Sequence, residues 1–120
     1  MELNEILRSI GMTDNEIKVY LSNLTIGSQT ANSIAEKAGL LRTTAYEVLK
    51  VLINKGLESY SIKNGVKYFE AVDPGRLVSI LEEKKQNLKR IIPDLIKIKE
   101  SVYEKPSVEF YEGKEGLKTI

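Results

Sequence analysis

Near residue 57 the hydrophobic period changes from helical to alternating, and this change constrains the fold more than any other feature. Before it, apolar residues recur at helical spacing and glycines end most of the runs. After it, two β-prone runs flank Asn64-Gly65, which is the strongest short hairpin signal because both turn positions need positive φ. Helices followed by one hairpin are typical of a winged helix-turn-helix domain, which is mainly α with a small β-hairpin.

The expected helices before the hairpin cover residues 3–10, 13–26, 30–38 and 42–55. Thr13 and Glu16 fit a capping box at the start of the second helix. Beyond Gly39, only Leu40 and Leu41 separate the third helix from the fourth, and such a tight connection is typical of the helix-turn-helix motif. We therefore predict a winged helix-turn-helix domain over residues 1–72, with the wing at residues 57–71.

A long helix is expected over residues 73–105, with Asp73 as its N-cap and Pro74 at its first position. Its seam positions are spaced 4 and 3 residues apart in turn, as in a coiled coil, with Lys84 as the one polar interruption. Roughly 30 residues at ~1.5 Å each give a rod of about 45 Å. The predicted homodimer interface comprises Leu77, Leu81, Leu88, Ile91, Leu95, Ile98 and Val102.

Two alternatives concern this helix. Pro93 lies inside it and removes one backbone hydrogen bond, but it falls at the outermost heptad position. We expect a bend near residues 89–93, or two helices in series. The apolar stripe could also pack onto its own domain, although it is too long for a domain of ~70 residues to cover, so a partner chain is favoured.

The tail, residues 106–120, reads as one strand, with Val108 and Phe110 alternating, followed by the start of a helix. Such a segment cannot bury a core alone. Either the chain is a fragment of a longer protein, or the tail pairs with something else.

Composition excludes several kinds of chemistry. The chain has no histidine and no cysteine, which rules out disulfides, thiolate nucleophiles, Cys/His zinc sites and histidine acid–base catalysis. Its carboxylates are scattered and lack the spacing of a calcium loop. We therefore predict no catalytic residue, metal or cofactor. Without an apolar run of ~18 residues or a signal-peptide pattern, we expect a cytoplasmic protein with no membrane contact.

Charge alone gives only a weak indication of a partner. Lys plus Arg is 18 and Asp plus Glu is 17, so the net charge is +1. The surplus lies at residues 28–72 and 73–105, each with a net charge of +2. This surplus of positive charge indicates a nucleic-acid partner only if the fold places the basic residues on one face.

In a winged helix, the second helix of the motif enters the major groove of double-stranded DNA. Its outward residues are therefore the candidate groove contacts: Arg42, Thr43, Thr44, Tyr46, Glu47 and Lys50. The start of the preceding helix and the wing are suited to the backbone or minor groove. They contribute Ser28, Gln29, Thr30, Lys63, Asn64 and Lys67. Any amphipathic helix also shows polar residues outward, and Tyr46 could instead pack under the wing.

Several blocks of sequence resemble those of TrmB-type transcriptional regulators, which are mainly archaeal. The blocks run from Gly11 to Leu21, from Ala35 to Gly39, from Thr44 to Leu57 and from Phe69 to Pro74. The resemblance covers roughly residues 5–105 and implies a DNA-binding and dimerisation part. The segment from Pro106 to Leu117 resembles the entry to the family's C-terminal effector domain. Because that domain is missing here, no effector site is expected in these residues.

The sequence thus predicts a sequence-specific DNA-binding regulator that acts as a homodimer and is not an enzyme. The alternative is a winged-helix module that binds proteins without specific DNA binding, which the low net charge permits. A further alternative is a regulator without an effector domain, whose occupancy of DNA depends on its own concentration or on a partner.

Overall fold

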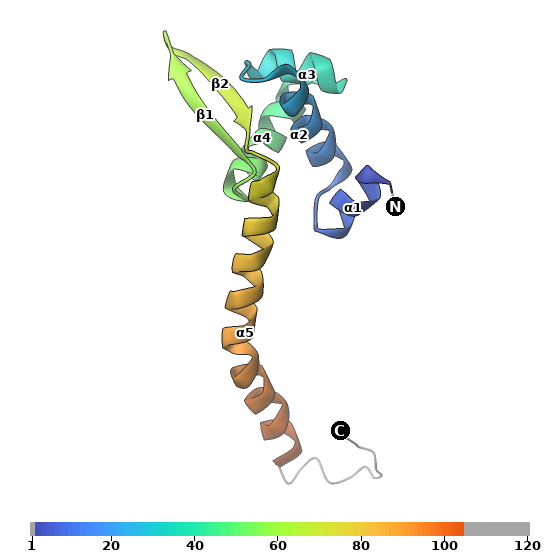
Figure 1. Cartoon of the computed structure of the whole chain (residues 1–120), viewed down its shortest axis with the longest axis vertical. Helices are drawn as coiled ribbons and strands as arrows, with labels where there is room; N and C mark the ends of the chain where they lie inside the picture. The colour runs from blue at the N-terminus through green and yellow to red at the C-terminus, as the bar shows by residue number, and fades with distance from the viewer. Residues whose placement is uncertain (1, 105–120) are drawn as a thin grey trace. The chain divides into compact units, whose positions relative to one another are not determined.

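The computed structural model describes residues 2–104, and the predicted tail strand and helix start lie outside these residues. The elements are α1 (Leu3–Ser9), α2 (Asp14–Ile26), α3 (Ala31–Ala38), α4 (Arg42–Asn54), β1 (Glu58–Lys63), β2 (Val66–Ala71) and α5 (Gly75–Glu104). The chain divides into two units, Met1–Ile80 and Leu81–Ile120. The first is a winged helix, in which the β1–β2 hairpin stands beside the helices (Figure 1).

Local capping signals place the helix starts. The Thr13 side chain accepts a hydrogen bond from the Glu16 amide, and Glu16 Oε1 accepts one from the Thr13 amide at 3.1 Å. The predicted capping box is therefore confirmed. Thr30 caps α3 through the Ser33 amide, and Gly39 ends that helix in the left-handed conformation with φ of 72°.

The hairpin forms around the predicted turn. β1 and β2 pair antiparallel from Glu58 opposite Ala71 to Lys63 opposite Val66. Asn64 and Gly65 between them have φ values of 51° and 76°, as a type I′ turn requires. The predicted hairpin is confirmed.

The core of the first unit lies where α2, α3, α4 and the hairpin meet. Its largest fully buried side chains are Tyr20, Phe69, Ile17, Ile34, Leu49, Leu52, Val19 and Asn23. The helical spacing of Ile17, Tyr20, Leu21 and Leu24 predicts one apolar face for α2. This prediction was partly wrong, because Leu24 is 39% exposed whereas Val19 is fully buried. Since α3, α4 and β2 all pack against α2, they surround more of it than one helical stripe.

A short backbone bridge joins the loop before α3 to the hairpin. The Gln29 amide donates to the Phe69 carbonyl at 3.1 Å, and the Phe69 amide donates to the Gln29 carbonyl at 2.7 Å. Asn23 Nδ2 also donates to the Phe69 carbonyl, at 3.2 Å. The inner edge of the wing is thus bound to the helices that precede it.

The Asp73 carboxylate accepts a hydrogen bond from the Gly75 amide at 3.0 Å, as expected of an N-cap. The helix α5 begins at Gly75, one residue after the predicted first position, Pro74. Leu77 and Ile80 in its first turns pack against the winged-helix core. The helix is continuous through Pro93, so the alternative of two helices in series was wrong. The expected bend near residues 89–93 stays a prediction.

Candidate nucleic-acid interface

A groove of about 510 Å³ lies between the start of α3, the start of α4 and the wing. It brings together four of the residues singled out in the sequence, namely Thr30, Arg42, Tyr46 and Lys67. The groove is also lined by residues that sequence reasoning missed: Ala31, Asn32, Gly65, Val66 and Phe69. Asn32 and Val66 could have been found, because one lies in the first turn of α3 and the other directly follows the hairpin turn.

The first turn of α4 presents most of its predicted contact residues to solvent. Arg42 and Thr43 are exposed, and Thr44 is half-buried. Glu47 and Lys50, one turn later, are exposed and form an ion pair of 3.2 Å with each other. Exposed pairs of this kind contribute little to stability, so both side chains can exchange this contact for another.

Tyr46 lies under the wing, which was the alternative that the sequence left open. Its ring meets the Phe69 ring edge-on, with ring centres 6.2 Å apart. Its Oη accepts a hydrogen bond from Lys67 Nζ at 3.2 Å. Tyr46 therefore lines the groove while packed against the hairpin.

The residues before α3 have separate roles in the fold. Ser28 is exposed, and Gln29 is bound through its main chain to Phe69. The Thr30 hydroxyl accepts from the Ser33 amide at 3.2 Å. One amide of this helix start is therefore already occupied by its own cap.

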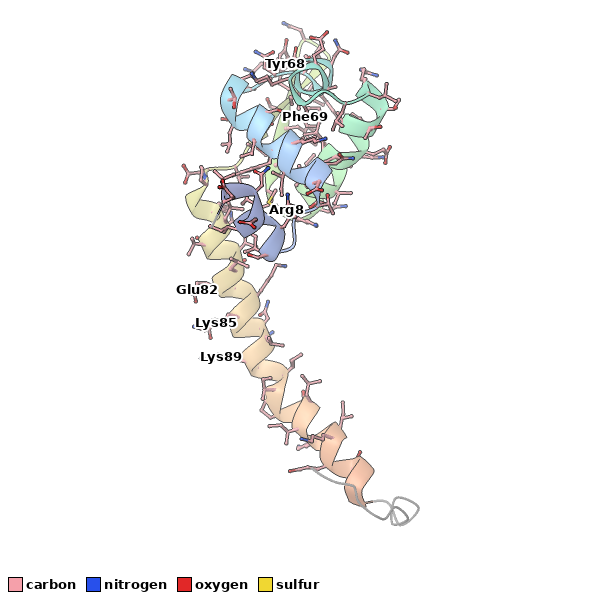
Figure 2. All side chains as sticks on the ribbon, turned by 90° about the vertical axis from the view of Figure 1, so that its right-hand side faces the viewer. Arg8, Tyr68, Phe69, Glu82, Lys85 and Lys89 are labelled. Atoms are coloured by element: carbon pink, nitrogen blue, oxygen red, sulfur yellow. The ribbon has the colours of Figure 1, made fainter. Side chains whose placement is uncertain are left out.

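The two wing lysines differ in their surroundings. Lys63 is exposed beside the hairpin turn, with its Nζ 5.7 Å from the centre of the Tyr68 ring. Lys67 is half-buried, and its Nζ lies 4.5 Å from the centre of the Tyr60 ring. Figure 2 labels the neighbouring Tyr68 and Phe69, and Phe69 is the buried one of the two. The sequence could not separate the lysines, since both flank the same turn.

A buried carboxyl group lies at the root of the wing. Glu58 is only 3% exposed, and neither of its carboxylate oxygens has a hydrogen-bond partner among the described residues. Burial, followed by the charge of Glu70, raises the pKa of Glu58 to about 8. The group is therefore held in its protonated form near neutral pH.

Along α5, the predicted seam positions beyond the winged-helix unit are exposed: Leu81, Leu88, Ile91, Leu95 and Ile98. Ile92 and Ile96 widen this apolar surface. Glu82, Lys85 and Lys89 project from one side of the helix (Figure 2). Leu77 instead packs on the winged-helix core, and the surroundings of Val102 lie outside the described side chains.

Two negative findings apply to the described residues. No group of three or more acidic side chains there could hold a metal ion. Within residues 2–104, no helix combines the length and the apolar character needed to cross a membrane.

Comparison with known proteins identifies relatives of this arrangement. Residues 7–75 match the protein family described as "Sugar-specific transcriptional regulator TrmB". An uncharacterized protein of Methanocaldococcus jannaschii, MJ1082, is 36% identical over 86 residues, which are 68% of this chain and 72% of that protein.

Solved structures share the fold. The archaeal chromatin protein TrmBL2, described as having a novel mode of DNA binding, superposes with a TM-score of 0.76 at 20% identity. That match covers 95% of this chain and 46% of TrmBL2, so the chain spans about half the length of that protein. A possible transcriptional regulator from Methanosarcina mazei superposes with a TM-score of 0.59 at 14% identity, covering 81% of this chain and 88% of its own.

Proposed function

The chain belongs to the TrmB family of transcriptional regulators, and we propose that it binds double-stranded DNA sequence-specifically as a homodimer. It has the winged-helix fold of DNA-binding regulators and is not an enzyme. The observation that carries the proposal is the groove at the start of α4, which exposed Arg42 lines together with Val66 and Lys67 of the wing.

In the proposed complex, the first half of α4 lies in the major groove. Arg42 binds a guanine edge or a phosphate, and Thr43 and Thr44 contact phosphate or a thymine methyl. Glu47 accepts from a cytosine amino group, which requires its exposed ion pair with Lys50 to open. Lys50 then becomes available to a phosphate.

The DNA backbone is contacted from both sides of α4. Ser28 and Thr30 bind it near the start of α3, and Lys63 and Asn64 bind it from the wing. Ser28, Lys63 and Asn64 are exposed, which supports their role.

Dimerisation uses the exposed apolar stripe of α5. A twofold pair of recognition helices reads two half-sites, so that the operator is expected to be palindromic. In a parallel pairing, Asp94 of one chain would meet Lys99 of the other. The stripe supports this proposal because it leaves large apolar side chains in water over several helical turns.

The experiment that tests this function is selection from a pool of random duplex DNA at two salt concentrations, followed by sequencing. Enrichment of a two-part palindrome, weakened by salt, supports a dimeric reader of sequence. Retention without enrichment would indicate an architectural, non-specific binder. If no DNA is retained even at low salt, the protein-interaction alternative takes its place.

The variant Arg42→Ala separates base contact from phosphate contact. We expect it to weaken binding to the enriched sequence by about tenfold and binding to random DNA by much less. The matched control is Arg8→Ala, since Arg8 lies on α1 and pairs with Asp14 at 2.7 Å. Equal losses on both kinds of DNA would assign Arg42 to a phosphate.

A further inference from the structure

The amine of Lys67 is held by aromatic side chains of the winged-helix unit. Its Nζ donates a hydrogen bond to Tyr46 Oη at 3.2 Å and lies 4.5 Å from the centre of the Tyr60 ring. The same Nζ lies 5.6 Å from the centre of the Tyr46 ring. One ammonium group on β2 thus contacts both α4 and β1, at distances where a ring attracts a cation.

The Phe69 ring packs against the rings of both tyrosines. The Tyr46 ring meets it edge-on, and the Tyr60 ring lies 6.0 Å from it, centre to centre. Phe69 is itself buried, and its main chain is bound to Gln29 by two hydrogen bonds. We call Tyr46, Tyr60, Lys67 and Phe69 the tyrosine–lysine cluster.

The tyrosine–lysine cluster lies at the groove where the proposed DNA contacts are made. Three of its members, Tyr46, Lys67 and Phe69, line that groove together with Arg42. Arg42 precedes Tyr46 by four residues, so both lie on the same side of α4. The separation between Arg42 and the wing therefore depends on how firmly the cluster binds β2 to α4.

We propose that Lys67 is a positioning residue, which holds the wing against α4 and sets the width of the DNA-binding groove without binding a phosphate itself. This inference rests on the proposed function. The other wing lysine, Lys63, lies at the exposed end of the hairpin and remains available to the DNA backbone. The two lysines therefore act differently although they flank one turn.

The salt dependence of DNA affinity distinguishes these roles. A lysine that neutralises one phosphate contributes about 0.9 to the slope of log affinity against log salt concentration. We expect Lys63→Met to reduce that slope by about this amount. Lys67→Met should weaken binding about threefold to tenfold at every salt concentration and leave the slope unchanged, because it removes a cation from the rings and not from a phosphate.

Two further variants test whether Lys67 acts through the tyrosines. Lys67→Arg should retain wild-type affinity and slope, since a guanidinium group also binds aromatic faces. Tyr46→Phe keeps the ring and removes the hydroxyl that accepts from Lys67. The loss caused by Lys67→Met should be smaller in this background than in the wild type, as expected for two coupled residues. Thermal unfolding of each variant verifies that it is folded.

Several results would overturn the inference. If Lys67→Met lowered the salt slope as Lys63→Met does, Lys67 would be a phosphate ligand. Unchanged affinity in folded Lys67→Met, or an equal loss with and without the Tyr46 hydroxyl, would remove the positioning role. Wild-type protein that bound no DNA would reject the proposed function and this inference together, whereas the other results reject the inference alone.

Discussion

The winged-helix unit and the helix beyond Ile80 carry similar apolar periodicities, but the described residues bury only the first. Leu49 in α4 is fully buried against the other helices and the hairpin. Leu95 in α5, also at a regular helical spacing, is 46% exposed. The apolar periodicity therefore predicts which face of a helix is apolar in both units. It does not predict which other surface packs against that face.

The most direct test of this difference in burial is to truncate one leucine in each unit. Leu49→Ala should lower the free energy of unfolding by about 2 to 5 kcal/mol at any protein concentration, because it leaves a cavity in a closed core. Leu95→Ala should destabilise the protein only at concentrations where it dimerises. Chemical denaturation at two protein concentrations measures both, and equal, concentration-independent losses would contradict the comparison.

The buried carboxyl of Glu58 gives the stability of the winged-helix unit a dependence on pH. Its pKa is raised in the folded state from 4.5 to about 8, so the folded protein binds more protons than the unfolded chain between these values. Its contribution to stability is therefore fully present below about pH 4.5 and is lost as the pH rises through about 8. The slope is at most ~1.4 kcal/mol per pH unit.

Glu58→Gln should remove that slope, and the variant should be more stable than wild type at pH 9 by about 2 to 4 kcal/mol. Denaturation curves from pH 4 to pH 9 measure the effect. Glu47→Gln, at an exposed position of α4, is the matched control. Its stability should change with pH as that of the wild type does. A Glu58→Gln curve parallel to the wild type would show that the carboxyl gains no proton on folding.

Replacing Lys84, the one polar residue of the α5 seam, tests whether this seam forms the homodimer interface. Lys84→Leu places an apolar side chain at a seam position and should tighten the homodimer by about 1 to 2 kcal/mol, or roughly tenfold. Lys97→Leu, on the outer side in the same heptad register, should change dimerisation little. Sedimentation equilibrium of both variants measures the dissociation constant. Equal tightening would mean that dimerisation does not use the predicted seam.

The smallest expected effect tests the hairpin turn. Gly65→Ala forces a side chain into a position with φ of 76° and should cost about 1 to 2 kcal/mol of stability. Ser61→Ala, on the exposed part of β1, is the control and should change stability by less than about 0.5 kcal/mol. Urea denaturation separates the two, and a stability loss no larger than that of the control would show that the turn adopts another conformation.

Features controlled by neighbouring residues were predictable from the sequence. The capping box of Thr13 and Glu16 and the turn at Asn64-Gly65 each need only a few consecutive residues, and both were predicted. The helix order and the hairpin followed from such signals. The sequence also singled out four of the residues that line the groove, Thr30, Arg42, Tyr46 and Lys67, because in a winged helix-turn-helix domain the second helix of the motif is the candidate recognition helix.

Features that depend on contacts across the fold were not predictable. The heptad spacing continues smoothly through Leu77, so it could not reveal that this residue packs on the winged-helix core. The contact of Lys67 with the Tyr46 ring depends on how the hairpin lies on α4, and the burial of Glu58 depends on packing beyond its own strand. A charged residue in a strand gives no local sign of either outcome.

The bridge between Gln29 and Phe69 also bears on how the chain folds as it is synthesised. These residues are forty positions apart, and the Tyr20 hydroxyl donates at 2.9 Å to the carbonyl of Val72, still further along the chain. Contacts between such distant residues close late and slow folding relative to a simple helical bundle. The four helices before the hairpin should therefore emerge from the ribosome without a finished core and consolidate only once the second strand is available.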